Sequence, residues 1–481
     1  MHNEPLLSLR DHITAVADMG ELRRVDGTHW DLELGAVAEL SYQLPRPPAV
    51  LFDDIVGYRK GLRVLTGSTG SARRLGRTLR LGHDLDDAGV VEALRGRPSR
   101  WAAAASDFPV EIVDDAPLLA NELTGDDIDL LAFPVPRWHA ADGGRFIGTG
   151  CFVVTSNPDT GVHNGGCYRM EVQDEGRSAT IAAVPGKHGA QNIERWIARE
   201  GRAPVTVSFG HDPLLLVLGG TEVPAGISEL DYAGAVLGAR VPVVRAPDTG
   251  LLIPAGSEIA VEGWLTPDNL REEGPFGEWT GYYSGRRRPC LNLDITRLWH
   301  RDDPILLGAP PGRPPHDYSY MRTVMKSAMI EDELVTLGVP GVRSVWAHES
   351  GGGRLFIAVS LEQRYHGHAR QVAALTAQCP AAAYMNRYVV AVDDDIDPSD
   401  LEQVIWAMST RSDPQRDIEV LRYGWGSKLD PLLPEGEPAY NSRAIIDACR
   451  PFERRGDFPA VARSDPEYLA GVREKWRHLL G

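Results

Sequence analysis

The amino-acid sequence predicts an α+β protein of several domains, and three observations support this fold class. The chain has 481 residues, a length typical of roughly three domains, with 43% hydrophobic and 24% charged residues. Its middle contains one short apolar strand pattern after another. Its C-terminal third alternates strand and helix patterns, as α/β domains do. We therefore expect an N-terminal α/β segment (1–112), a β-rich domain (113–305), a linker (306–319) and a C-terminal α/β domain (320–481).

The N-terminal segment opens with a helical spacing of apolar residues over 6–22. Short apolar runs follow at 48–52 and 62–65, and an arginine-rich helical stretch covers 71–81. Residues 114–132 are acidic and favour loops. This part of the chain therefore predicts a small α/β unit that ends in an irregular stretch.

In the central domain, β-branched or apolar runs bounded by Gly, Pro, Asn and Asp predict strands. Two helices interrupt them, at 191–200 and 228–239. In the second helix, Ser228 as N-cap and Asp231 three residues later form a capping-box pattern. The predicted strands cover residues 152–155, 205–209, 214–218, 258–265 and 291–298.

The C-terminal third begins after a proline-rich stretch, 302–317, which predicts a connector with no regular element. A long helix is predicted over 320–337, and an amphipathic helix over 466–480. Between them, predicted strands at 354–361 and 388–392 alternate with predicted helices at 366–377 and 401–409.

Charge and cysteine content argue against several classes of protein. The net charge of −17 repels nucleic-acid phosphates and anionic lipids, so we expect neither as a partner. Five cysteines without a CxxC pair argue against a disulfide framework and a structural zinc knuckle. The first residues are charged and lack the apolar core of a signal peptide, and no stretch approaches the length of a membrane span. We therefore expect a cytoplasmic protein.

Two patches of the central domain place polar groups beside glycine-containing turns. GVHNGGCYR at 161–169 sets the Asn164 amide and the Arg169 guanidinium around a glycine pair, where a ligand can approach the backbone closely. A second loop presents Lys187 and His188 immediately before a helix. Taken singly, the first is more often a tight turn and the second a surface histidine.

A third patch, EEGPFGE at 272–278, fixes a turn between Glu273 and Glu278. Two glutamates in a turn are commonly solvated charge, and Glu229 in the first turn of a helix is explained by the helix dipole. No P-loop, HExxH, GxSxG or strand–GxGxxG–helix pattern occurs, which removes the commonest nucleotide, zinc-protease, serine-hydrolase and Rossmann signatures. It is the occurrence of three patches together that indicates a site.

Taken in this order, the patches resemble the UbiD family of reversible, non-oxidative decarboxylases, which use prenylated FMN. EGPFGEWTGYY at 273–283 carries the resemblance most specifically, together with the Asn164-x4-Arg169 pattern placed 24 residues before His188. The runs VDDDID, VIWAMSTR and, more weakly, GSK match the family's C-terminal domain, at residues 392–397, 404–411 and 426–428.

The resemblance implies a central split β-barrel that is flavin-reductase-like and FMN-binding. It also implies an N-terminal α/β segment and a C-terminal α/β oligomerisation domain, with a homodimer or hexamer as the assembly. A flavin prenyltransferase would supply the cofactor. The substrate would be a small aromatic, heteroaromatic or α,β-unsaturated carboxylic acid, because the flavin needs a π-system conjugated to the carboxylate.

By the same resemblance, Asn164, His188 and Glu229 bind a divalent ion, Mn²⁺ or Mg²⁺, that bridges to the flavin phosphate. An amide oxygen, an imidazole and a carboxylate suit such an ion. The loop 219–222 matches a K⁺ site on backbone carbonyls. The cofactor-binding residues implied, the first two beside the isoalloxazine ring, are Thr149, Cys151, Asn164, Arg169, Lys187, His188, Glu229 and Lys428.

The catalytic residues implied are Arg169, Glu273 and Glu278. Arg169 anchors the substrate carboxylate and pairs with Glu273, a role that suits a planar guanidinium. Glu278 lies in an apolar pocket that raises its pKa, so it holds a proton and delivers it to the carbon that has lost CO₂.

Two alternatives stay open: a non-catalytic, flavin-binding UbiD-like subunit, and a divalent-metal hydrolase that activates water with the same three ligands. The sequence also departs from the family pattern. Lys187 stands where some relatives have Gln, and residues 381–384 read AAAY where some carry a phosphate-binding lysine. His316 either faces the pocket or lies on a surface loop.

Overall fold

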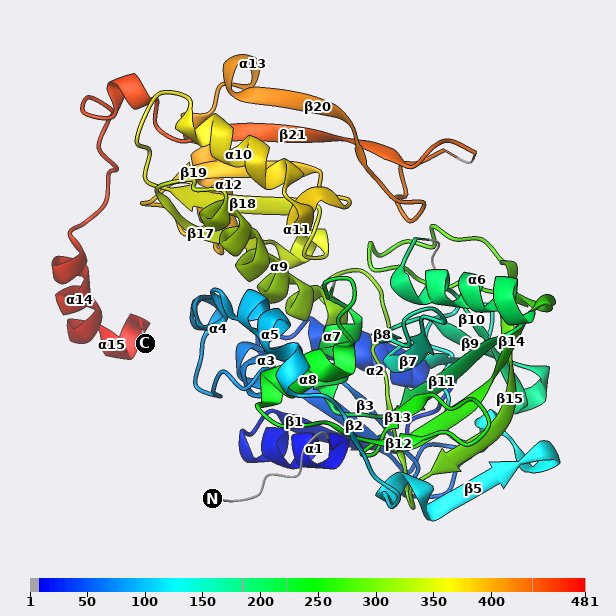
Figure 1. The fold of residues 1–481 in the computed structure, drawn as a ribbon. Helices are drawn as coiled ribbons and strands as arrows, with labels where there is room; N and C mark the ends of the chain where they lie inside the picture. Colours follow the sequence, from blue (N-terminus) through cyan, green and yellow to red (C-terminus); the bar gives the residue numbers. More distant parts are fainter. Residues whose placement is uncertain (1–7, 184–185, 222, 435, 481) are drawn as a thin grey trace.

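The computed structural model describes residues 8–183, 186–221, 223–434 and 436–480. Four sheets and their flanking helices make up the described residues, which confirms the mixed α+β class. Figure 1 shows a body formed by the first two thirds of the chain, in blue to green, and a C-terminal unit, in yellow to red, with helix α9 running between them. Among the described residues, no helix combines the length and the apolarity needed to cross a membrane.

The N-terminal part contains a four-stranded sheet in the order β1-β2-β3-β16. The helix predicted over 6–22 is shorter, because α1 ends at Asp18 and strand β1 begins at Leu22; residues 6 and 7 lie outside the described residues. The connector predicted over 302–317 was expected to hold no element, and this is wrong for β16, which pairs with β3. The bounds are α1 Leu9–Asp18, β1 Leu22–Asp26, α2 Glu33–Tyr42, β2 Ala49–Asp53, β3 Arg63–Thr66, α3 Ala72–Thr78, α4 Asp87–Leu94, α5 Arg97–Ala104 and β16 Ile305–Leu307.

A nine-stranded sheet forms the centre of the molecule, in the order β6-β9-β10-β15-β14-β11-β7-β8, with β5 paired to β15. Its end strands β6 and β8 do not pair with each other in the described part of the chain, so no barrel is closed. The bounds are β5 Asn121–Thr124, β6 Phe146–Gly148, β7 Cys151–Ser156, β8 His163–Gly166, β9 Met170–Gln173, β10 Ser178–Ile181, β11 Ala203–Phe209, β14 Ile259–Glu273 and β15 Arg288–His300.

Strands β14 and β15 form a long antiparallel hairpin in which Glu273 is paired with Arg288. Residues 274–287 connect the two strands and carry Glu278. The hairpin therefore holds Glu273 on the last residue of a strand and Glu278 on the loop that follows it.

The sequence prediction of a strand over 214–218 is wrong, because these residues form helix α7, Pro213–Gly219. The run is apolar at every position and all of it is buried, so no periodicity distinguishes a strand from a helix. The Asp212 side chain accepts a hydrogen bond from the Leu214 amide at 2.8 Å, and Pro213 occupies the first turn. This cap and this proline favour the helix.

The other helices of the central domain are α6, His188–Glu200, and α8, Glu229–Leu237, close to their predicted ranges. Ser228 caps α8, as predicted, by accepting from the Leu230 amide at 3.3 Å. A small sheet in the order β13-β12-β4 lies at one edge, with bounds β4 Glu111–Ile112, β12 Pro242–Arg245 and β13 Leu252–Pro254.

The C-terminal unit is a five-stranded sheet in the order β17-β18-β19-β21-β20 with helices against it, as the alternating pattern predicts. The tail predicted as one helix forms two short ones, α14 and α15. The bounds are α9 Asp317–Thr336, β17 Val342–Ala347, β18 Phe356–Leu361, α10 His368–Gln378, α11 Pro380–Ala383, β19 Tyr388–Asp393, α12 Leu401–Arg411, α13 Pro414–Asp417, β20 Ile418–Trp425, β21 Tyr440–Ala448, α14 Pro466–Lys475 and α15 Arg477–Leu480.

Helix α9 joins the two units because its two ends are buried in different cores. Met321 and Val324 pack into the core shared by the N-terminal and central parts. Ile330 and Leu334, further along the helix, pack into the core of the C-terminal sheet. The helix therefore fixes the C-terminal unit against the central sheet that carries the candidate site.

Candidate functional site

Arg169 brings the two predicted glutamates together. Its Nε and Nη2 donate to the two carboxylate oxygens of Glu273 at 2.5 and 2.8 Å. Its Nη1 donates to Oε1 of Glu278 at 2.9 Å. The guanidinium therefore bridges carboxylates from either side of one turn, and its planar shape allows the two-pronged contact with Glu273.

This ion-pair group is largely withdrawn from water. The Glu273 side chain is 0% exposed, that of Arg169 17% and that of Glu278 13%. Burial raises the pKa of the Glu278 carboxyl above its ordinary range, in the predicted direction, while the Arg169 guanidinium opposes the rise. The Arg169 guanidinium also lies 5.4 Å from the ring centre of buried Phe276. A carboxyl with a raised pKa beside a fixed cation can hold a proton and deliver it.

The backbone of Gly143 packs closely against the turn between the two glutamates. The Gly143 amide donates to the Pro275 carbonyl at 2.8 Å, and a Cβ built on Gly143 would lie 2.0 Å from the Gly274 carbonyl oxygen. Only glycine therefore permits this close approach of the two backbones.

Replacing Gly143 by alanine should displace the turn and lower turnover on the order of 10- to 100-fold, because small displacements of reacting groups are costly. Steady-state kinetics of folded Gly143→Ala protein would measure the loss. Gly456→Ala is the matched control, since a Cβ there meets nothing within 4 Å. Turnover of Gly143→Ala equal to that of the control would show that the contact does not hold the turn.

A second cluster joins Asn164 on β8 to Glu229 at the start of α8. Glu229 accepts from the Asn164 side-chain amide at 2.9 Å and from the Gly165 backbone amide at 2.6 Å. Burial raises the pKa of the Glu229 carboxyl to about 7 against these two hydrogen bonds. Asn164 Oδ1 is buried and has no hydrogen-bond partner. An orphaned amide oxygen beside a buried carboxylate fits a hard divalent cation, which would satisfy both groups.

His188 lies outside this contact. It is the first residue of α6, it is exposed, and no hydrogen bond joins it to Asn164 or Glu229 in the described structure. The helix nevertheless begins near the cluster: a Cβ on Gly189 would lie 2.4 Å from the Tyr168 hydroxyl oxygen, and burial together with the charge of Glu229 raises the pKa of Tyr168. Among the residues described, no three His, Cys, Asp or Glu side chains lie in an arrangement that could hold a metal ion.

The two lysines predicted to bind the cofactor, Lys187 and Lys428, lie in different parts of the structure. Lys187 Nζ lies 5.9 Å from the ring centre of Tyr384, in the stretch where some relatives carry a lysine. Lys428 is exposed in the loop between β20 and β21, in the C-terminal unit.

In the loop predicted to bind K⁺, residues 219–222, the Gly219 carbonyl accepts from the Cys167 amide at 3.2 Å, and Glu222 lies outside the described residues.

Comparison with known proteins relates most of this chain to one protein family. The profile of the 3-octaprenyl-4-hydroxybenzoate carboxy-lyase Rift-related domain (UbiD) matches residues 110–314, and those of the N- and C-terminal domains match 13–94 and 319–448. A phenolic acid decarboxylase of Streptomyces sp. (strain D7) is 31% identical over 95% of this chain and 96% of its own. The chain belongs to the UbiD family. A pyrrole-2-carboxylic acid decarboxylase of Pseudomonas aeruginosa is 29% identical over 94% of this chain and 92% of its own.

Solved UbiD-class structures share this fold over nearly the full chain. The enzyme HmfF from Pelotomaculum thermopropionicum, in complex with FMN, superposes with a TM-score of 0.82 and 26% identity, covering 96% of this chain and 99% of its own. An evolved dimeric form of HmfF in complex with prFMN gives 0.79 and 25%, covering 96% and 97%. The UbiD family consists of carboxy-lyases, so this chain is an enzyme of that class.

Three other predicted residues of this UbiD protein are buried. The Thr149 hydroxyl accepts from the Ala309 amide at 3.1 Å, and the Cys151 thiol donates to the Tyr168 carbonyl at 3.1 Å. His316 is 3% exposed, so the surface-loop interpretation of this residue is wrong. Its Nε2 lies 3.4 Å from the carbonyl oxygen of Trp279, the residue after Glu278, and burial lowers the pKa of its imidazole to about 3.

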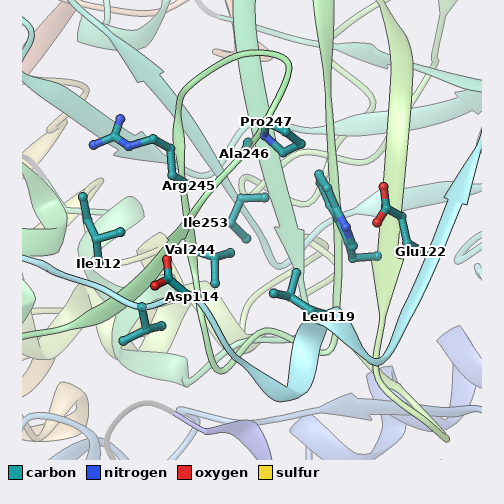
Figure 2. A pocket seen from close by; sticks show the side chains of 11 residues that line it. Ile112, Asp114, Leu119, Glu122, Val244, Arg245, Ala246, Pro247 and Ile253 are labelled. Carbon is teal, nitrogen blue, oxygen red and sulfur yellow. The ribbon is translucent and has the colours of Figure 1, made fainter.

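A separate cavity of about 280 Å³ opens at the edge of the small sheet. Figure 2 shows Arg245 and Glu122 on opposite sides of it, with Val244 and Ile253 between them. None of the residues predicted for the site lines this cavity. The cavity of this UbiD protein therefore lies apart from the predicted site residues.

Sequence analysis missed Glu171 as a functional candidate. It lies on β9, two residues after Arg169, which immediately precedes that strand. Its side chain is buried, at 4% exposure, and accepts a hydrogen bond from the Gly274 amide at 2.7 Å. No motif marks it in the sequence. The only available signal was the spacing, since residues i and i+2 of an extended strand point to the same side.

Proposed function

We propose that this protein is a reversible, non-oxidative decarboxylase of an aromatic, heteroaromatic or α,β-unsaturated carboxylic acid, and that it uses prenylated FMN. The observation that carries the proposal is the largely buried Arg169 guanidinium held between Glu273 and Glu278. The related phenolic acid and pyrrole-2-carboxylic acid decarboxylases support an aromatic or heteroaromatic substrate.

In this proposal Arg169 binds and orients the substrate carboxylate. Its Nε–Nη2 edge is committed to Glu273, whereas Nη1 holds Glu278 by a single 2.9 Å bond that an incoming carboxylate can displace. Displacement would free Glu278 from the cation that lowers its pKa, so its carboxyl would more readily hold a proton. Glu278 then donates that proton to the carbon that has lost CO₂, and in the carboxylation direction its carboxylate removes the proton from the same carbon.

The bound prenylated flavin would supply the electron sink for breaking the carbon–carboxylate bond. We propose that Asn164, His188 and Glu229 hold Mn²⁺ or Mg²⁺ at its phosphate, with K⁺ on the 219–222 loop. The unpartnered Asn164 Oδ1 supports this assignment. His188 would have to turn toward the cluster to complete it. The proposed cofactor-binding residues are Thr149, Cys151, Asn164, Arg169, Lys187, His188, Glu229 and Lys428.

The same proposal treats the central sheet as a flavin-reductase-like split barrel, with the domain limits 1–112, 113–305, 306–319 and 320–481. It includes a homo-oligomer formed through the C-terminal domain, a cytoplasmic location and a flavin prenyltransferase as cofactor supplier. The dimeric prFMN-bound form of HmfF supports the cofactor and is compatible with the assembly.

The test is to identify the bound cofactor by mass and absorbance after anaerobic purification from cells that co-express a flavin prenyltransferase. Wild type should retain FMN carrying a five-carbon prenyl unit. His188→Ala and Glu229→Gln should retain it at least about tenfold more weakly, because each removes a proposed metal ligand. His366→Ala, an exposed histidine of the C-terminal unit, is the control.

Folded wild type without any flavin would overturn the proposal. A colourless protein with metal-dependent hydrolytic activity would instead favour the metal hydrolase. A protein that binds prenylated FMN and leaves every tested unsaturated acid unchanged would favour the non-catalytic subunit.

A further inference from the structure

Glu171 is a buried carboxylate that has no part in the substrate binding, proton transfer or metal binding proposed for this site. Its side chain contacts the segment whose two carboxylates bind Arg169: Glu171 Oε2 accepts from the Gly274 backbone amide at 2.7 Å. Gly274 directly follows Glu273. Two side chains that are two residues apart, Arg169 just before β9 and Glu171 on it, therefore contact one segment: Arg169 binds the carboxylates of Glu273 and Glu278, and Glu171 accepts from a backbone amide between them.

Two adjacent glycines, Gly143 and Gly144, make room for this arrangement. A Cβ on Gly144 would lie 2.2 Å from Glu171 Oε1, so glycine leaves the space that the carboxylate fills. The neighbouring Gly143 amide donates to the Pro275 carbonyl at 2.8 Å. The Gly274–Pro275 unit is thus bonded at its amide by Glu171 and at its carbonyl by Gly143.

The charges around Glu171 show that its position is costly. Burial raises the pKa of the Glu171 carboxyl to about 7, and the neighbouring Glu273 carboxylate adds to the rise. Arg287 and Arg169 act in the opposite direction, as does the bond from the Gly274 amide. A carboxyl group kept in such a place, with 4% exposure, needs a compensating role, which the amide bond supplies.

We propose that Glu171 is a positioning residue that fixes the Gly274 amide and thereby sets the placement of Glu278 relative to Glu273. The effect of Glu171 on catalysis rests on the proposed function. Its hydrogen bond to the Gly274 amide does not, and can be tested without any activity.

The test compares Glu171→Leu, which is of similar size but accepts no hydrogen bond, with Glu171→Gln, which keeps an acceptor. The readout is hydrogen–deuterium exchange of peptides that contain residues 273–278. The Gly274 amide should exchange at least about fivefold faster in Glu171→Leu, since a lost hydrogen bond is worth on the order of 1 kcal/mol or more. It should exchange at nearly the wild-type rate in Glu171→Gln. Glu175→Gln, an exposed glutamate four residues later, is the control for charge removal.

In the cofactor-loaded enzyme, Glu171→Leu should lower kcat by about tenfold or more with little change in KM, and Glu171→Gln should restore most of it. Wild-type exchange in Glu171→Leu would overturn the proposal, as would a Glu171→Gln variant as impaired as Glu171→Leu. If loaded wild type decarboxylates nothing, the proposed function fails while the exchange measurement still tests the positioning role. If Glu171→Leu does not fold, Gly144→Ala crowds the same carboxylate; faster Gly274 exchange in it supports the proposal, and unchanged exchange contradicts it.

Discussion

Substitution of Glu278 by glutamine should lower decarboxylation by about 10²- to 10⁴-fold, the range for losing a general acid. The amide in the Glu278→Gln variant retains the shape of the side chain and an oxygen for the Arg169 Nη1 contact, but it has no acidic proton to deliver. The cofactor should still bind, because Glu278 is not among the proposed cofactor ligands. The measurement is the single-turnover rate of CO₂ release by the fully loaded variant.

The pH dependence of decarboxylation is a second test of Glu278 as the proton donor. Because burial raises the pKa of Glu278, its acid form persists above the usual carboxyl range, and wild-type decarboxylation should fall as the pH rises through that pKa. The residual rate of Glu278→Gln should lack this fall. Glu272→Gln, at an exposed glutamate on β14 just before the loop, is the control. If Glu278→Gln releases CO₂ as fast as this control, another group delivers the proton.

The regular elements could largely be predicted from sequence, because their patterns are local. Strand β15 and the helices α6, α8 and α9 lie near their predicted ranges, whereas β14 continues to Glu273, eight residues beyond its predicted end at 265. The segment 214–218 could not be assigned this way, since a run of consecutive buried apolar residues has neither a helical nor a strand period. There the capping side chain of Asp212 and the following proline decide the structure.

The candidate site required more than spacing. Arg169 and Glu273 are 104 residues apart, and no local pattern brings them together. The resemblance to the UbiD family supplied that pairing, and the structure shows the contact. It could not supply Glu171, because a glutamate in a strand has no motif and its role depends on a backbone amide from another part of the chain. It also did not determine the orientation of His188, which no local sequence pattern fixes.

Substitution of Arg169 by methionine should abolish measurable decarboxylation and also destabilise the fold. Glu273 is 0% exposed and its two oxygens bond to Arg169, so the variant leaves a buried carboxylate without its cation. Breaking such a pair costs about 3–5 kcal/mol of unfolding free energy. Denaturant unfolding of the cofactor-free protein would measure this loss, and Arg177→Met, at an exposed arginine, controls for the substitution itself.

The double variant Arg169→Met with Glu273→Gln separates the structural role of Arg169 from its catalytic one. Removing the buried charge together with its partner should recover at least about half of the lost unfolding free energy, because a neutral amide is far cheaper to bury than an unpaired carboxylate. Decarboxylation should nevertheless stay absent, since neither side chain can then bind the substrate carboxylate or hold Glu278 through its 2.9 Å contact. Recovery of activity along with stability would mean that Arg169 serves only to neutralise Glu273. Recovery of neither would mean that the methionine disrupts the packing against Phe276, whose ring centre lies 5.4 Å from the guanidinium. Stability without activity is the outcome that shows that the Arg169–Glu273 pair serves catalysis and not only the stability of the fold.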